Sequence, residues 1–153
     1  MIKLDKTDLA ILRTLQGDSK LTTKELAQKI NLSTTPTYER VRRLEHEGYI
    51  QKYIAVLDAK RLDFGFTVFC TVKLKQLNAQ IANEFTTAIT EIQEVMECYN
   101  VSGDFDYMLK IQVPNMKAYQ HFVLNILGQI ESVGSLQSIF VIDEIKRNFA
   151  YPI

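Results

Sequence analysis

Between residues 66 and 146 the chain alternates strand-like stretches with two helical stretches, in the order strand, helix, strand, strand, helix, strand. Period-two runs of β-branched and aromatic residues indicate the strands, and apolar residues at helical spacing indicate the helices. The predicted strands cover residues 66–75, 95–102, 107–113 and 136–146, and the predicted helices cover 79–90 and 116–127. Two helices that cross over one sheet in this order form a ferredoxin-like βαββαβ layer.

The predicted strands carry apolar side chains on both faces. In the first strand Val68 and Cys70 can face the helices while Phe69 points the other way, and in the last strand Phe140 alternates with Ile139. Two helices cover only one face of a sheet, so the other face is left as an exposed apolar patch. We expect a second copy of the chain to cover it about a two-fold axis. The alternative is that the first 57 residues fold back over this face.

The first third of the chain predicts three short helices. Asp5 can cap a helix whose third position is Asp8, and Thr22 and Glu25 have the spacing of a capping box. Gly17 is suited to a left-handed residue that ends the first helix.

The third helix is predicted to run to about residue 47 and to stop at Gly48. Either Ser33 caps it with Pro36 in the first turn, or Thr35 caps it with Pro36 as the first helical residue. We favour Thr35, because a residue before proline is pushed to the extended angles that a cap requires.

Spacing separates two faces on this third helix. Tyr38, Val41 and Leu44 make a buried seam, and Thr37 and the arginines lie on the other face. Two helices joined by a short turn, with hydroxyls and arginines exposed on the second, are typical of a helix that enters the DNA major groove. The candidate DNA-binding residues are Ser33, Thr34, Thr35, Thr37, Arg40, Arg42 and Arg43. The alternative is a small helical core whose arginines only keep it soluble.

Charge favours the same third of the chain as the partner of a polyanion. Residues 1–57 hold ten Lys and Arg and seven Asp and Glu, which gives +3, whereas the whole chain sums to zero. After Gly48, β-branched and aromatic residues over 49–57 predict a strand or extended arm that leaves the helical unit.

The residues between the second and third strands predict a hairpin turn that can bind a small ligand. Gly103 permits positive φ and leaves its neighbouring amides uncovered, so the turn can present N–H groups to a carboxylate. Asp104 or Asp106 can accept hydrogen bonds from an ammonium group. The alternative is that Asp104 only stabilises its own turn through a side-chain to backbone bond.

Composition excludes several other classes. With 46% apolar and 24% charged residues the chain has the profile of a globular protein, and no apolar run approaches the roughly 20 residues that span a bilayer. We therefore expect a cytoplasmic protein with no membrane partner. Cys70 and Cys98 have no metal-ligand spacing and are expected to be buried thiols. His46 and His121 have no ligand-spaced partners, so we expect neither a metal, nor a cofactor, nor an enzyme.

In these residues the chain resembles the Lrp/AsnC, or feast/famine, family of transcriptional regulators. The resemblance lies in Leu4-Asp5-Lys6-Thr7-Asp8 with Ile11-Leu12, in Leu26-Ala27 and Leu32-Ser33, in Arg40-Val41-Arg42-Arg43-Leu44-Glu45 with Gly48-Tyr49-Ile50, and in the run from Glu97 to Tyr107. It implies an α+β chain: a winged-helix-like helix-turn-helix domain, an extended arm, and a ferredoxin-like (RAM- or ACT-like) domain. The corresponding ranges are 1–50, 51–65 and 66–153.

The resemblance also implies a function. Members of this family are sequence-specific DNA-binding regulators, form dimers that often assemble into octamers as tetramers of dimers, and bind small effectors, usually amino acids, between subunits. Carried onto this chain, the effector-binding residues are Tyr99, Val101, Gly103, Asp104, Asp106, Ser135, Gln137 and Ser138. The expected partners are double-stranded DNA, a second copy of the chain and an amino acid. The alternative is an amino-acid-binding oligomeric module whose helical domain contacts protein.

Overall fold

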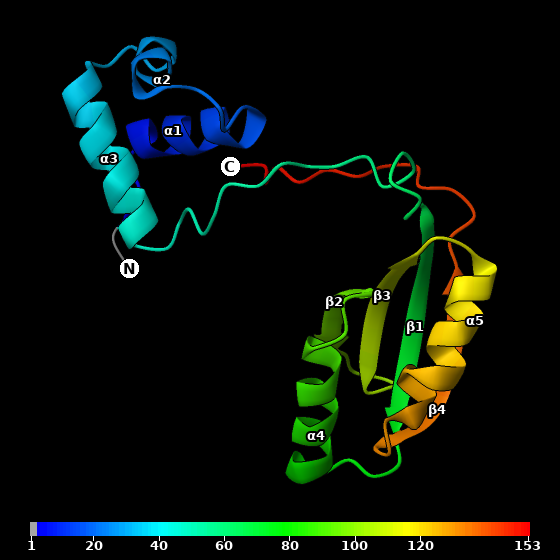
Figure 1. Cartoon of the computed structure of the whole chain (residues 1–153). Coiled ribbons are helices and arrows are strands. Elements are labelled where there is room, and N and C mark those ends of the chain that lie inside the picture. The colour runs from blue at the N-terminus through cyan, green and yellow to red at the C-terminus, as the bar shows by residue number, and fades with distance from the viewer. Residues whose placement is uncertain (1–2) are drawn as a thin grey trace. The chain divides into compact units, whose positions relative to one another are not determined.

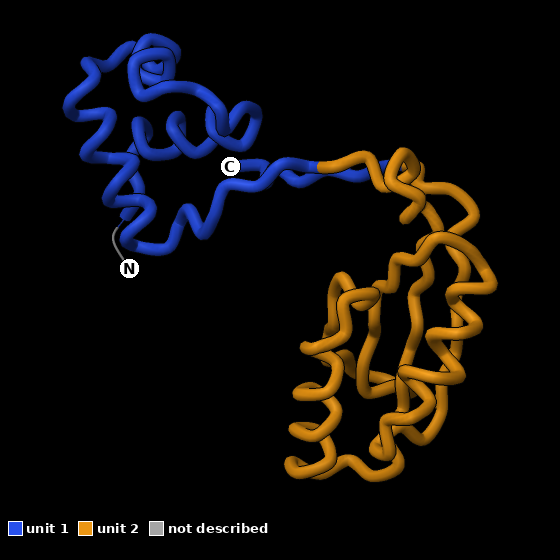
Figure 2. Tube along the Cα trace, viewed as in Figure 1, with its two compact units in different colours: residues 1–56, 146–153 blue, residues 57–145 orange. Residues whose placement is uncertain are grey.

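A computed structural model describes residues 3–153, which form two compact units (Figures 1 and 2). The first unit contains the residues up to Val56 together with Lys146–Ile153, and the second contains Leu57–Ile145. In sequence, the second unit is therefore inserted between two parts of the first. The division into 1–50, 51–65 and 66–153 remains a prediction, and the contacts group the last eight residues with the helical unit.

Three helices pack around the small core of the first unit. They are α1 (Lys6–Gly17), α2 (Thr23–Lys29) and α3 (Thr34–His46). The buried residues Ile11, Leu26 and Leu44 contribute one core side chain from each helix. Both predicted helix starts are confirmed, because Asp5 and Thr22 each form a reciprocal capping box with the residue three positions on.

The start of α3 corrects the sequence prediction. Ser33 is the N-cap residue and Thr35 is helical, so Pro36 occupies the third helical position. Proline is tolerated there because the first-turn amides have no intrahelical partners. The earlier start also gives Thr37 two bonds to the Ser33 carbonyl, one from its N–H (3.2 Å) and one from its hydroxyl (2.9 Å).

The helix ends are predicted with mixed success. Gly48 follows α3 with φ +75°, as its place after the helix predicts. The prediction for Gly17 is wrong, since it is the last helical residue of α1, and the extended Asp18 forms the C-cap. Residues 51–57 form the predicted arm, without strand pairing.

The second unit is the predicted ferredoxin-like layer. Its elements are β1 (Phe66–Leu74), α4 (Ala79–Thr90), β2 (Val95–Asn100), β3 (Tyr107–Val113), α5 (Met116–Asn125), a short 3₁₀ helix (Leu127–Gln129) and β4 (Val133–Phe140). The four strands are antiparallel in the order β2-β3-β1-β4. This order confirms the α+β fold class.

The central strand β1 separates the two faces of the sheet. Val68, Cys70 and Val72 are fully buried on the helix side, where they pack in one core with Phe85 of α4 and Phe122 of α5. On the opposite, open face, Phe69 lies between Lys110 of β3 and Ile139 of β4. The predicted alternation of β1 is therefore confirmed, and the open face holds both apolar and charged side chains.

The last strand is shifted from its predicted range of 136–146. It begins at Val133, because Gly134 lets the chain approach β1 closely: a Cβ there would lie 3.0 Å from the Lys75 nitrogen. It ends at Phe140, opposite Val68, and only the Val141 N–H continues the ladder, to Thr67. Because β1 starts at Phe66, which lies opposite residue 142 in this register, no residue of β1 is left to pair with residues 143–146.

Two smaller predictions also need correction. The second strand ends at Asn100, two residues before its predicted end, where Val101 donates its N–H to the Asp106 carbonyl and closes the hairpin turn. Cys70 is buried, but Cys98 is exposed on the edge strand β2, so the prediction of two buried thiols is wrong for Cys98.

Candidate DNA-binding surface and effector region

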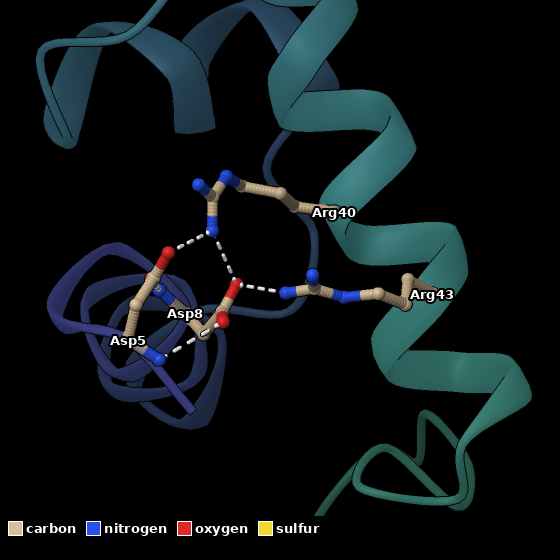
Figure 3. A network of polar contacts seen from close by, with 4 residues as sticks. All are labelled: Asp5, Asp8, Arg40 and Arg43. Atoms are coloured by element: carbon tan, nitrogen blue, oxygen red, sulfur yellow. Dashed lines mark hydrogen bonds and ion pairs between the residues drawn. The ribbon is translucent and has the colours of Figure 1, made fainter. Parts of the chain in front are cut away.

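An ion network joins the start of α1 to one side of α3 (Figure 3). The Asp8 carboxylate, only 2% exposed, accepts hydrogen bonds from Arg40 (2.7 Å) and Arg43 (2.6 Å) on one oxygen. Its other oxygen accepts the Asp5 N–H at 3.1 Å as part of the helix cap. A buried carboxylate is stable only when it is paired in this way.

Asp5 extends the network towards solvent. Its carboxylate accepts a second bond from Arg40 at 2.6 Å. The Asp8 N–H, and then the Arg40 side chain, hold the pKa of Asp5 below its usual value, and the same ion pairs raise the pKa of Arg40. Two of the three arginines that the sequence predicts as DNA contacts are therefore held against α1, with 29% of the Arg40 and 40% of the Arg43 side chain exposed.

The exposed side of α3 carries a different set of residues. Thr34, Tyr38 and Arg42 lie one helical turn apart, and all three are exposed, Tyr38 to 54% and the Arg42 side chain to 68%. We define these three residues as the α3 stripe. Arg42 forms a long ion pair with Glu45, at 3.9 Å.

The predicted buried seam of α3 is confirmed at Val41 and Leu44, which belong to the core of the first unit, and is wrong at its first residue. Thr37, predicted to face outward, is fully buried, and Tyr38, predicted in the seam, is exposed. Of the candidate DNA-binding residues, the structure exposes Ser33, Thr34, Thr35 and Arg42, half-buries Arg40 and Arg43, and buries Thr37. Sequence reasoning missed Tyr38 because an amphipathic tyrosine fits either face of a helix.

The predicted effector region centres on the β2–β3 turn at one end of the sheet. Gly103 has φ +123°, and a Cβ there would meet no atom within 4 Å, so its backbone is open to a ligand. Asp106 anchors this turn to the end of β1: its carboxylate accepts the Leu74 N–H at 2.8 Å, and its own N–H donates to the Val72 carbonyl at 2.9 Å.

Asp104 is the free acid of the turn. Its carbonyl accepts a bond from the Lys73 ammonium at 3.0 Å, but its carboxylate makes no hydrogen bond or ion pair within residues 3–153. The alternative that the Asp104 side chain stabilises its own turn therefore finds no support. Sequence reasoning missed Lys73 as a residue of this turn. The signal was its charge, because Lys73 is the one charged residue among the open-face positions of β1 and stands at the end of the strand.

Four of the other candidate effector residues lie either near this turn or on the open face of the sheet. Val101 follows β2 into the turn, and Ser135 pairs with Lys73 at the same end of the sheet. Tyr99 and Gln137 lie on the open face, where the Tyr99 hydroxyl bonds to Glu97.

Ser138 instead faces the helix layer. Its hydroxyl lies 2.6 Å from that of Tyr119, whose pKa burial raises to about 12. The structure therefore brings Val101, Gly103, Asp104, Asp106 and Ser135 together and separates the other three.

Within residues 3–153 no group of three or more His, Cys, Asp and Glu side chains could hold a metal ion. In the same range no helix is both long and apolar enough to cross a bilayer.

Family models match almost the whole chain. Residues 4–51 match a winged helix-turn-helix DNA-binding domain, and residues 67–151 match the Lrp/AsnC ligand-binding domain. The chain belongs to the Lrp/AsnC family of transcriptional regulators. It is a transcriptional regulator with a DNA-binding and a ligand-binding domain, which confirms the predicted function class.

Relatives within the family cover the full length of the chain. A Bkd operon transcriptional regulator of Pseudomonas aeruginosa is 42% identical over 153 residues, which is all of both chains. The leucine-responsive regulatory protein of Escherichia coli is 39% identical over 95% of this chain and 88% of its own. A crystal structure of a Neisseria meningitidis transcriptional regulator in complex with L-methionine is 33% identical, with a TM-score of 0.94 over 98% and 97% of the two chains.

The ion network predicts effects of different size on stability for two adjacent arginines. We expect Arg43→Ala to lower the free energy of unfolding by about 1–2 kcal/mol, because Asp8 loses a charged hydrogen bond but keeps Arg40. Arg42→Ala is the matched control and should change it by less than about 0.5 kcal/mol, because the Arg42 side chain is 68% exposed and its ion pair with Glu45 is long, at 3.9 Å. Urea denaturation of the two variants measures the difference, and equal losses would contradict a structural role for Arg43.

Proposed function

We propose that this regulator reads DNA with the α3 stripe and responds to an amino acid bound at the β2–β3 turn. One observation carries the first half of the proposal: Arg40 and Arg43 pair with Asp8, which leaves Thr34, Tyr38 and Arg42 as the outward side of the helix. A helix that follows a short turn and exposes such residues is suited to the major groove.

Each member of the α3 stripe has a chemical role in this proposal. Arg42 can reach a guanine edge through two parallel hydrogen bonds or pair with a phosphate. Thr34 is the first helical residue and lies where the free amides of the first turn attract phosphate. Tyr38 offers a ring for contact with a thymine methyl group and a hydroxyl for phosphate. Ser33 and Thr35 flank this stripe, and the half-exposed Arg40 and Arg43 remain proposed phosphate contacts at its edge.

The DNA contact is tested with a duplex selected from a random library by the wild-type protein. Arg42→Ala should weaken binding to it about tenfold or more, since a specific arginine contact is worth about 1–3 kcal/mol. Arg61→Ala, whose side chain is 87% exposed in the second unit, is the charge-matched control and should bind like wild type. Gel retardation at several salt concentrations gives both the affinity and its salt dependence.

Two results would overturn this assignment. Unchanged affinity in Arg42→Ala would mean that α3 does not read the duplex through the stripe. Failure to select any duplex, together with a partner interaction that does not weaken as salt rises, would favour the alternative in which the helical domain contacts protein.

We infer further that the open sheet face pairs with that of a second copy. Phe69, Met108 and Ile139 form an apolar centre on neighbouring strands, and the ion pair between Lys110 and Glu97 (2.8 Å) lies beside it. No helix of the second unit covers this face, since α4 and α5 both pack on the other side. Two such faces about a two-fold axis would bury the apolar centre and present two copies of α3 to one duplex.

Phe69→Arg tests the pairing of the two sheets. Wild type should scatter light with at least twice the 17.6 kDa mass of the chain, and the variant should scatter as a single chain because it places a charge in the apolar centre. Leu77→Arg, at a residue that is 74% exposed outside the sheet, is the control and should stay paired. A wild-type mass of 17.6 kDa would refute the pairing. Assembly into an octamer stays a prediction.

The effector in this proposal is an amino acid. The unpaired Asp104 carboxylate can accept bonds from an α-ammonium group, and the open amides around Gly103 can donate to an α-carboxylate. Lys73 places a positive charge beside the same turn. Asp106 acts as the anchor of the turn, and Val101 and Ser135 line its surroundings. The remaining candidates, Tyr99, Gln137 and Ser138, keep only their support from the family resemblance.

A thermal-shift screen of the twenty amino acids tests the effector site. At least one should raise the melting temperature, because a ligand that binds only the folded state stabilises it. Asp104→Asn should weaken binding of that amino acid about tenfold, since it removes a charged hydrogen bond and keeps the shape. Asp143→Asn, at an exposed residue beyond β4, is the control. If no amino acid shifts the melting temperature, or if Asp104→Asn binds like wild type, the turn is not the site.

A further inference from the structure

The C-terminal segment of the chain forms hydrogen bonds with two side chains of α1. The side-chain amide of Gln16 accepts the Tyr151 N–H at 2.6 Å and donates to the Tyr151 carbonyl at 3.3 Å. Three residues earlier on the same helix, the Arg13 side chain donates to the Ile153 carbonyl. Residues three apart on a helix are neighbours about 5–6 Å apart, so the two side chains form one short docking surface.

This surface recognises main-chain groups of the segment. A glutamine amide presents one donor side and one acceptor, as a peptide group does, so it can pair with a residue as a neighbouring strand would. The exposed fraction of the Tyr151 side chain is 78%, and that of Phe149 is 54%. The aromatic rings therefore contribute little to the docking.

The segment is ordered locally before it reaches α1. Arg147 lies 4.7 Å above the Phe149 ring, and the Ala150 N–H donates to the Asn148 side chain at 3.0 Å. Pro152 has no N–H to leave unpaired, and the Ile153 N–H closes a tight turn on the Tyr151 carbonyl at 2.9 Å. Local order of this kind lowers the entropy that docking must overcome.

We propose that the Gln16 and Arg13 surface of α1 is a docking site for residues 146–153 of the same chain. Docking gives the helical unit a second connection to the inserted unit, in addition to the arm at 51–57. The contacts are few and exposed to water, so docking is weak and reversible. This inference goes beyond the proposed function and does not depend on it.

Amide hydrogen exchange of the peptide 146–153, measured by mass spectrometry on the full-length protein, tests the docking. Gln16→Leu keeps a good helix former and removes both bonds to Tyr151, so exchange of this peptide should become about five- to tenfold faster. Gln28→Leu, the same change at an exposed glutamine of α2, is the control and should match wild type. Equal exchange in all three proteins would overturn the proposal.

Two changes at Tyr151 test main-chain recognition from the other side. Tyr151→Ala keeps the N–H and should leave the side-chain amide resonances of Gln16 in place, whereas Tyr151→Pro removes the N–H and should shift them. If the side-chain amide resonances of Gln16 shift in Tyr151→Ala as well, the ring makes the contact and main-chain recognition is refuted. Protection of peptide 146–153 that increases with protein concentration would assign the segment to a second copy and overturn docking on its own α1.

Discussion

The buried Asp8 carboxylate determines which side of α3 faces outward. Its position at the third residue of α1 lets it close the helix cap and, from the same carboxylate, bind Arg40 and Arg43 of α3. These arginines lie three residues apart, so pairing them with one acid turns a single side of α3 towards α1. The α3 stripe lies on the opposite side as a direct consequence. The ion network therefore both joins α1 to α3 and selects the surface that we propose for DNA.

The end of β1 has a comparable role in the second unit. The strand is central, pairs with both β3 and β4, and is buried by both helices on one side. Asp106 holds the β2–β3 turn to Val72 and Leu74 of this strand through two hydrogen bonds. Lys73, which lies between these two residues in sequence, donates to the Asp104 carbonyl of the same turn. A turn held in this way keeps its open amides and the free Asp104 carboxylate in a fixed arrangement, which favours binding of a small ligand.

Features set by neighbouring residues could be predicted from the sequence, and features set by distant contacts could not. The two capping boxes, the range of α4 and the range of β3 follow from signals within a few residues. The roles of Arg40 and Arg43 depend on an acid 32 and 35 residues away, which the sequence shows only as a helix cap. The end of β4 depends on where β1 begins, and the exposure of Tyr38 depends on a one-residue phase that helical periodicity does not resolve.

The insertion of the second unit into the first gives the Asp8 network a mechanical consequence. The arm at 51–57 leaves the helical unit just after α3, and the returning segment binds α1. The Asp8 network therefore joins the helix that the arm follows to the helix that binds the C-terminal segment. If one helix moved without the other, the buried Asp8 carboxylate would lose its ion pairs with Arg40 and Arg43, which would destabilise the folded unit. The ion network therefore favours a fixed spacing of α1 and α3, which keeps the residues of the α3 stripe together on the outward side of the helix.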